Sequence, residues 1–158
     1  MNAVPLQIRP AAPADFSRIE SMVIESFAPI TWARKLDQEF GPLNGLDWRA
    51  RWSLRLGKIF QEQIVLVGEA DGGLAAMSSS ALERKSALAY IDLLAVERQR
   101  QRHGYGRYML RGTIRHLEQM GAKYVNLDCL TDNDHANELY RGEGFREVAR
   151  HIRWFREI

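Results

Sequence analysis

The chain has 158 residues, of which 46% are hydrophobic and 27% are charged, and its formal net charge at pH 7 is only +2. This length and composition fit one globular domain, which we predict over residues 1–158. The small net charge argues against a nucleic-acid partner. No apolar run approaches the ~20 residues of a membrane span, which argues against a membrane protein.

Two further features bear on where the protein works. The opening residues, MNAVPLQIRP, contain no apolar core of signal-peptide length. The single cysteine, Cys129, has no partner for an internal disulfide, which suits a reducing compartment. We therefore expect a cytoplasmic protein.

Hydrophobic periodicity and turn residues predict the elements of the fold. In chain order these are a strand at 6–10, a helix from Pro13 to near Ser26, a less regular region at 29–63 with helices at 31–40 and after Asp47, strands at 64–70, 74–82 and 87–96, a helix at 105–120, a strand at 123–130, a helix at 133–143 and one or two strands at 145–158. The strands at 87–96 and 123–130 flank a helix, so we expect them to be parallel with a right-handed crossover. The predicted class is α/β (α+β), with a single mixed sheet and helices on both faces.

The segment QRQRHGYGRYML, residues 99–110, follows the long central strand and admits three interpretations. A dinucleotide loop would need a third glycine where Met109 stands, and a tight turn in place of the long charged loop. A nucleic-acid patch would need exposed aromatic residues beyond Tyr105 or a recognisable module. The third interpretation is a loop that holds the phosphates of another cofactor.

Physical reasoning favours this third interpretation. A loop that enters a helix offers free backbone N–H groups and the positive end of the helix dipole. Gly104 and Gly106 let the backbone approach a pyrophosphate closely, and Gln101 can donate from its side-chain amide. The neighbouring arginines, which also read as a solvated helix face, add positive potential; they are Arg98, Arg100, Arg102, Arg107, Arg111 and Arg115.

Two motifs in the second half of the chain resemble those of the GNAT superfamily of N-acyltransferases. The first is Gln101-Arg102-His103-Gly104-Tyr105-Gly106, which resembles the family's acyl-CoA loop, Q/R-x-x-G-x-G/A. The second is NDHANELYRGEGF, which resembles the family's Asn-x-x-Ala-x-x-Leu-Tyr-x-x-x-Gly-Phe; it matches at Asn133, Ala136, Leu139, Tyr140, Gly144 and Phe145. The chain departs from the family at Arg98, where Pro is common, and at Ala12, where Thr or Ser often caps the first helix.

The resemblance implies a GNAT-like fold, acetyl-CoA as the cosubstrate and no metal. Its two central strands, at 87–96 and 123–130, would splay apart and leave backbone groups for the pantetheine arm. The residues that the resemblance assigns to the cofactor are Leu94, Ala95, Val96, Gln101, Arg102, His103, Gly104, Tyr105, Gly106, Arg107 and Asn133. Several have an ordinary structural interpretation as well, Leu94 and Val96 as core residues and Asn133 as a helix cap.

The reaction implied is direct attack of a primary amine on a thioester. Tyr140 is the predicted general acid, because the family places a tyrosine there and a phenol stays protonated at pH 7. Asp92 or Asp128 is predicted to assist deprotonation of the amine; each is equally well interpreted as a structural acid at a strand end. Along the strand, Asp92 shares a face with Leu94 and Val96 unless a β-bulge shifts the register.

The acceptor side is predicted within and just before residues 29–62. Its aromatic residues are candidate substrate contacts, although packing is their simpler interpretation; they are Phe27, Trp32, Trp48 and Trp52. A peptide N-terminus, a lysine side chain, a polyamine, an amino acid and an aminoglycoside all stay open as acceptors. A homodimer, common in the family, stays open as well. The alternatives to an enzyme are a GNAT-like module that binds acyl-CoA without turnover and, less favoured, a basic nucleic-acid-binding domain.

Overall fold

The computed structural model of the protein describes residues 5–158. The chain divides into two compact units, the first ending at Asp128 and the second comprising Cys129–Ile158. No helix among the described residues is long and apolar enough to cross a membrane.

The first unit contains one five-stranded sheet in the order β1-β2-β3-β4-β5. Neighbouring strands are antiparallel from β1 to β4, whereas β4 and β5 are parallel. The strands are β1 (Gln7–Pro10), β2 (Ile64–Ala70), β3 (Gly73–Glu83), β4 (Leu88–Val96) and β5 (Tyr124–Leu127). The helices are the 3₁₀ turns η1 (Pro13–Asp15) and η2 (Arg98–Arg100) and the α-helices α1 (Phe16–Phe27), α2 (Trp32–Phe40), α3 (Trp48–Glu62) and α4 (Tyr105–Gln119). The predicted mixed α/β class is confirmed.

Local sequence signals account for the boundaries of these elements. Thr31 caps α2 by accepting from the Ala33 N–H, and Asp47 caps α3 by accepting from the Ala50 N–H, as predicted for Asp47. Asp71 and the following glycine both have positive φ, as the two-residue hairpin turn between β2 and β3 requires. Each signal is local, which is why it could be identified in the sequence.

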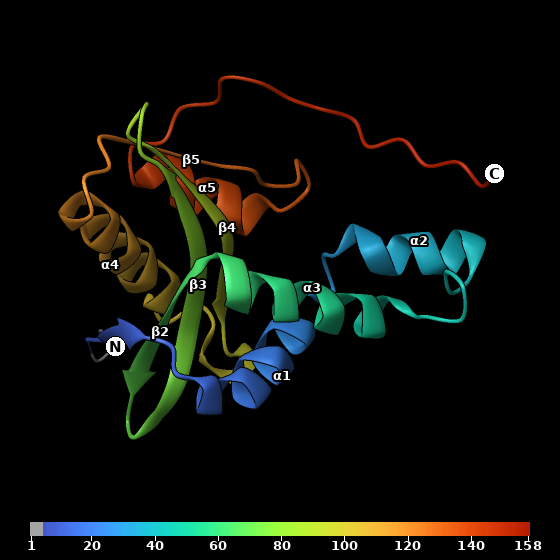
Figure 1. Ribbon diagram of the computed structural model, residues 1–158, viewed down its shortest axis with the longest axis horizontal. Coiled ribbons are helices and arrows are strands. Elements are labelled where there is room, and N and C mark those ends of the chain that lie inside the picture. The colour runs from blue at the N-terminus through green and yellow to red at the C-terminus, as the bar shows by residue number, and fades with distance from the viewer. Residues whose placement is uncertain (1–4) are drawn as a thin grey trace. The chain divides into compact units, whose positions relative to one another are not determined.

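The sheet is covered on both faces, as predicted. Figure 1 shows α1 and α3 on one side of the sheet and α4 on the other. On the α1/α3 side, Leu93 and Ala95 of β4 belong to the larger core cluster. On the α4 side, Leu94 and Val96 pack in a cluster around Met109. Burial of apolar side chains on both faces is the main stabilising contribution to this unit.

A β-bulge sets these two faces of β4. Ser79 of β3 lies opposite Leu93 and Ser80 lies opposite Ile91, so Asp92 has no partner across the ladder. The extra residue reverses the alternation beyond it. Leu94 and Val96 consequently face α4, whereas Asp92 contacts Arg55 of α3. The strict alternation that would put all three on one face is wrong for this strand.

The second unit contains α5 (Asp134–Gly142) followed by an irregular segment. Asn133 caps α5 by accepting from the Ala136 N–H, as predicted, and Gly144 of the second motif ends the helix with a φ of +87°. The strands predicted at 145–158 are not formed. The segment contains apolar and β-branched residues, but a strand also requires a neighbour to supply ladder hydrogen bonds, which one segment of sequence cannot reveal.

Arg9 of β1 forms ion pairs with Asp15 of η1 and with Glu69 of β2, and these pairs generate a stability prediction. The Arg9 guanidinium donates to Asp15 at 2.7 Å and to Glu69 at 2.8 Å. The bond from Arg9, with that from the Ala12 N–H, holds the pKa of Asp15 below its ordinary value. A depressed pKa adds stability above the unfolded-state value of about 3.9, and that stability is lost as the pH falls through the folded-state pKa.

We expect Asp15→Asn to lower the melting temperature at pH 7 by about 2 °C, since the pair is partly exposed. The Asn side chain still accepts from the Ala12 N–H, so the variant removes mainly the charge. Thermal melts between pH 3 and 8 should show the difference from wild type shrinking below pH ~4. A difference that is constant over this range would contradict the assigned role of the ion pair.

Candidate functional site

The open edge of β4 is the first feature of the candidate site. β5 pairs only with residues 88–91 of β4, so the second half of β4 has no strand on that side within the described residues. The Glu97 N–H, which follows β4, donates to the carbonyl of Ala75 on the neighbouring strand β3. Because backbone groups alternate along an antiparallel ladder, Leu94 and Val96 turn their N–H groups away from β3, toward the open edge. Ala95, opposite Met77, turns its backbone toward β3.

The Val96 carbonyl ties the loop to this strand. It accepts from the Ser26 hydroxyl at 2.7 Å and from the Gln101 side-chain amide at 3.2 Å. The amide predicted to reach a phosphate is therefore engaged by the protein backbone. The His103 ring nitrogen Nδ1 lies 2.8 Å from the Gln101 carbonyl, so the ring is held within the loop. These contacts fix the loop beside the open edge of β4.

The start of α4 is the second feature of the site. Gly104 is its N-cap residue, with a φ of +86°, and no side chain caps the helix there. The first amide groups of a 15-residue helix are thus left for another acceptor. Tyr105 anchors the helix, since its side chain is buried among Ala70 and Ala75. The chain before the helix is also unusual, with Arg102 at a φ of +65°.

The arginines around the loop divide into two kinds. Arg100 is structural: it donates to Glu97 at 3.0 Å and to the Ala70 carbonyl at 3.1 Å. Arg102 and Arg107 are exposed on either side of Gly104. An anion bound at the start of α4 would therefore meet positive charge at the rim of the site.

The two predicted carboxylates differ in their contacts. Asp92 accepts from the Arg55 guanidinium at 2.6 Å and from the Gln63 side-chain amide at 2.9 Å, and only 11% of its side chain is exposed. Asp128 is exposed and accepts from the Tyr90 hydroxyl at 3.3 Å. Burial, followed by the charge of Asp128, raises the pKa of Tyr90 to about 12. Tyr90 is therefore a hydrogen-bond donor at all physiological pH values.

The predicted acceptor-side aromatics are mostly part of the core. Trp52 is 5.4 Å from Phe27, ring centre to ring centre, and its indole N–H donates to the Thr31 hydroxyl at 3.2 Å. Trp48 is also buried, whereas Trp32 is partly exposed. Packing is thus the main role of Trp48 and Trp52, and each also has an arginine guanidinium over its ring, Arg49 and Arg55 respectively.

The second unit contains the other predicted catalytic residue. Tyr140 lies on α5 with its ring 5.9 Å from that of Phe145, in an edge-to-face arrangement. Burial, followed by interaction with Cys129, raises the pKa of Tyr140 above its ordinary value. The hydroxyl is accordingly protonated at neutral pH. The thiol of Cys129 is half-buried, and burial also raises its pKa, which makes it a poor nucleophile.

Sequence reasoning missed three contacts of this site. Arg55 follows Trp52 by three residues on one helix, a spacing that places them on the same side and could have identified the pair. Gln63 and Ser26 have no such signal, because their partners lie far away in the sequence. Among residues 5–158, no group of three or more histidine, cysteine or acidic side chains is arranged to hold a metal ion.

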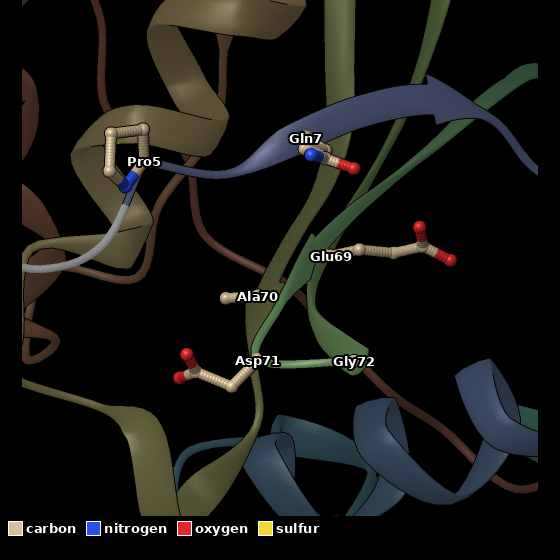
Figure 2. Close-up of a pocket in the computed structure, with 6 residues that line it drawn as sticks. All are labelled: Pro5, Gln7, Glu69, Ala70, Asp71 and Gly72. Carbon is tan, nitrogen blue, oxygen red and sulfur yellow. The ribbon is translucent and has the colours of Figure 1, made fainter.

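One surface hollow lies away from these features, beside the β2–β3 turn. Its lining is Pro5, Gln7, Glu69, Ala70, Asp71 and Gly72, and Figure 2 shows the two carboxylates pointing in different directions. Both acids are paired with arginines, Glu69 with Arg9 and Asp71 with Arg100. None of the predicted site residues belongs to this hollow.

Comparison with known families now identifies the class of protein. Residues 29–145 match the model described as the acetyltransferase (GNAT) family. This match covers most of the chain and spans both units. The protein therefore belongs to the GNAT acetyltransferase family and is an acyl-CoA-dependent N-acetyltransferase with acetyl-CoA as its cosubstrate.

Solved structures show the same fold. The chain is 11% identical, at a TM-score of 0.69, to AAC(6')-Iy in complex with the bisubstrate analogue CoA-S-monomethyl-acetylneamine, over 98% of this chain and 100% of the other. It is 14% identical, at a TM-score of 0.70, to the PaiA N-acetyltransferase of Thermoplasma acidophilum in complex with coenzyme A, over 90% and 91%. It is 19% identical, at a TM-score of 0.73, to a tetramutant of the BH1408 protein of Bacillus halodurans, over 94% and 98%. A comparison with proteins of curated function found no significant match.

The loop glycine provides a test of the anion site. We expect Gly104→Ala to weaken coenzyme A binding about tenfold or more, because a φ of +86° strains an alanine and moves the first amides of α4. Gly121, at the other end of α4 with a φ of +103°, is the matched control. Both variants should lose about 1 kcal/mol of stability. Titration calorimetry should show a loss of affinity only for Gly104→Ala; equal affinities would contradict the assignment.

Proposed function

We propose that the protein transfers the acetyl group of acetyl-CoA directly to a primary amine, and that its two units act as one acetyltransferase domain. The observation that carries this proposal is the juxtaposition, within the first unit, of the uncapped start of α4 and the open edge of β4. The first supplies amides for a diphosphate, and the second supplies amides for an extended arm. The residues present thus fit coenzyme A.

The cofactor would be held mainly by backbone groups. The N–H groups of Gly104, Tyr105, Gly106 and neighbouring loop residues would bind the diphosphate, with Arg102 and Arg107 adding charge at the rim. The N–H groups of Leu94 and Val96 would pair with the pantetheine amides. Asn133 would serve the arm in addition to capping α5. Acetyl-CoA supplies the activated acyl group as a thioester.

Asp128 is the better placed of the two carboxylates to assist the amine. An alkylamine with a pKa of about 10.4 is almost wholly protonated at pH 7, so a proton must leave before attack. Asp92 is already occupied by Arg55 and Gln63, whereas Asp128 is exposed and has a single weak partner in Tyr90. We therefore assign deprotonation to Asp128, through a water molecule, and give Asp92 a positioning role.

The remaining steps fall to Val96 and Tyr140. The Val96 N–H would donate to the thioester oxygen as negative charge develops on it. As the new C–N bond forms and the C–S bond breaks, Tyr140 would donate a hydrogen bond to the departing sulfur. A thiol pKa of about 8.5 lies below that of a tyrosine phenol, about 10, so the hydroxyl stabilises the thiolate without surrendering its proton completely. The motif around Tyr140 supports this role.

Tyr140 provides a test of turnover. We expect Tyr140→Phe to lower kcat on the order of 100-fold with little change in acetyl-CoA affinity, since only the leaving group loses its donor. Tyr108→Phe, an exposed tyrosine on α4, is the control. The measurement is thiol release from acetyl-CoA over a panel of amines. Unchanged kcat in Tyr140→Phe would remove the residue from the mechanism, and no thiol release with any amine would favour a binding module.

Asp128 provides a test of the base through pH. We expect Asp128→Asn to lower kcat/KM about 100-fold at pH 7. The deficit should shrink as the pH rises toward the pKa of the amine, because the free amine then forms without help. Asp92→Asn should show no such recovery with pH. A deficit for Asp128→Asn that is the same at pH 7 and pH 9.5 would contradict the assignment.

A further inference from the structure

Arg55 is a cation held at the acceptor side of the first unit. Its guanidinium lies 4.7 Å from the centre of the Trp52 ring and donates to Asp92 at 2.6 Å. Its side chain is nevertheless 42% exposed. One face of the Arg55 guanidinium is therefore covered by Trp52, and one of its nitrogens donates to Asp92. The other N–H groups of the planar guanidinium can still donate to a planar anion such as a carboxylate.

The surroundings of Arg55 are built to position it. Asp92 projects from the bulge of β4, and Gln63 holds the second oxygen of its carboxylate. A buried carboxylate with two donors is a rigid anchor, and a tryptophan face fixes the plane of the guanidinium. Such an anchor reduces the entropy lost when the arginine binds a ligand.

The charge of α3 favours an anionic group on the ligand. The helix carries Arg49, Arg51, Arg55 and Lys58, against the single acid Glu62; of these, Arg51 is paired with Asp37 at 2.7 Å, which leaves Arg49, Arg55 and Lys58 as its exposed cations. Arg49 also lies over an indole ring, that of Trp48, at 4.4 Å from its centre. A ligand with several positive charges would be repelled by this surface, whereas a carboxylate would be attracted. The helix is therefore poorly suited to aminoglycosides or polyamines.

The opposite charge lies close by. Tyr90 donates to Asp128 at 3.3 Å, and the same hydroxyl is influenced by the charges of Asp92 and Arg55. The partly exposed guanidinium of Arg55 is bound to Asp92, and the exposed carboxylate of Asp128 is bound to Tyr90, so both charges are tied to residues only two apart on β4. A small molecule whose amine and carboxylate are close together matches this pair of charges.

We propose that the acceptor is a small amine that carries a carboxylate next to its amino group, of the α-amino acid class. Arg55 binds the carboxylate, while the amino group lies toward Asp128. This inference rests on the proposed function and names its substrate class. Arg55 is a specificity-determining residue, and Asp92 is a positioning residue that acts through it.

The test compares free amino acids with their α-amides, which differ only in the charged carboxylate. Binding is measured by calorimetry to the protein saturated with coenzyme A, and turnover by thiol release from acetyl-CoA. We expect the wild type to bind its best free acid at least about tenfold more tightly than the matching amide. Arg55→Gln should reduce this ratio to about one or two, chiefly by weakening the binding of the free acid. Arg55→Lys should keep part of the preference.

Lys58→Gln is the matched control, because it removes one positive charge from the exposed side of the same helix one turn away. It should keep the wild-type ratio, and melting curves establish that both variants are folded. The inference is overturned if no free acid binds, if the amide or spermidine binds more tightly, or if Arg55→Gln keeps the preference. Failure of acetyl-CoA binding, measured separately, would instead overturn the proposed function.

Discussion

The structure depends on the parting of β4 from β5. Parallel pairing joins the two strands over residues 88–91 of β4. From there β4 continues to Val96, and no strand among the described residues pairs with its outer edge. Strand amides without a partner are costly when they are buried, so an edge of this kind needs a ligand, another strand or water. The loop that follows β4 is tied back to Val96 through Gln101, which brings the uncapped start of α4 to the same place. The proposed recognition of the cofactor by backbone groups follows from this single constraint.

The bulge at Asp92 links that edge to the acceptor side. One extra residue in β4 lets Leu94 and Val96 pack toward α4 while Asp92 projects toward α3. The two ligands would therefore both depend on this strand, the cofactor through its backbone and the acceptor through Asp92, which positions Arg55. The same bulge explains why Asp92 is a poor candidate for the base, since its projection delivers it to Arg55 and Gln63.

Features that are local in sequence could be predicted from it. The caps at Asp47 and Asn133, the turn at Asp71 and the left-handed Gly144 each depend on a few adjacent residues. Contacts between residues that are distant in the sequence could not be predicted from it. Examples are the hydrogen bonds of Asp92 with Arg55 and Gln63, and the β-bulge at Asp92. The strands predicted at 145–158 are wrong for a related reason, because composition describes one segment whereas a strand needs a second one to pair with. The family could be recognised from the sequence because the glycines at 104 and 106 and the second motif occur at a characteristic spacing.

The most direct measurement is residue-resolved amide hydrogen exchange of the protein with and without saturating coenzyme A. Backbone recognition predicts that the ligand slows exchange at Leu94 and Val96 and at the amides of residues 102–107. Ala95, whose backbone faces β3, serves as the internal reference and should change little. Coenzyme A that binds while leaving these edge and loop amides unchanged, with protection confined to other segments, would contradict the account.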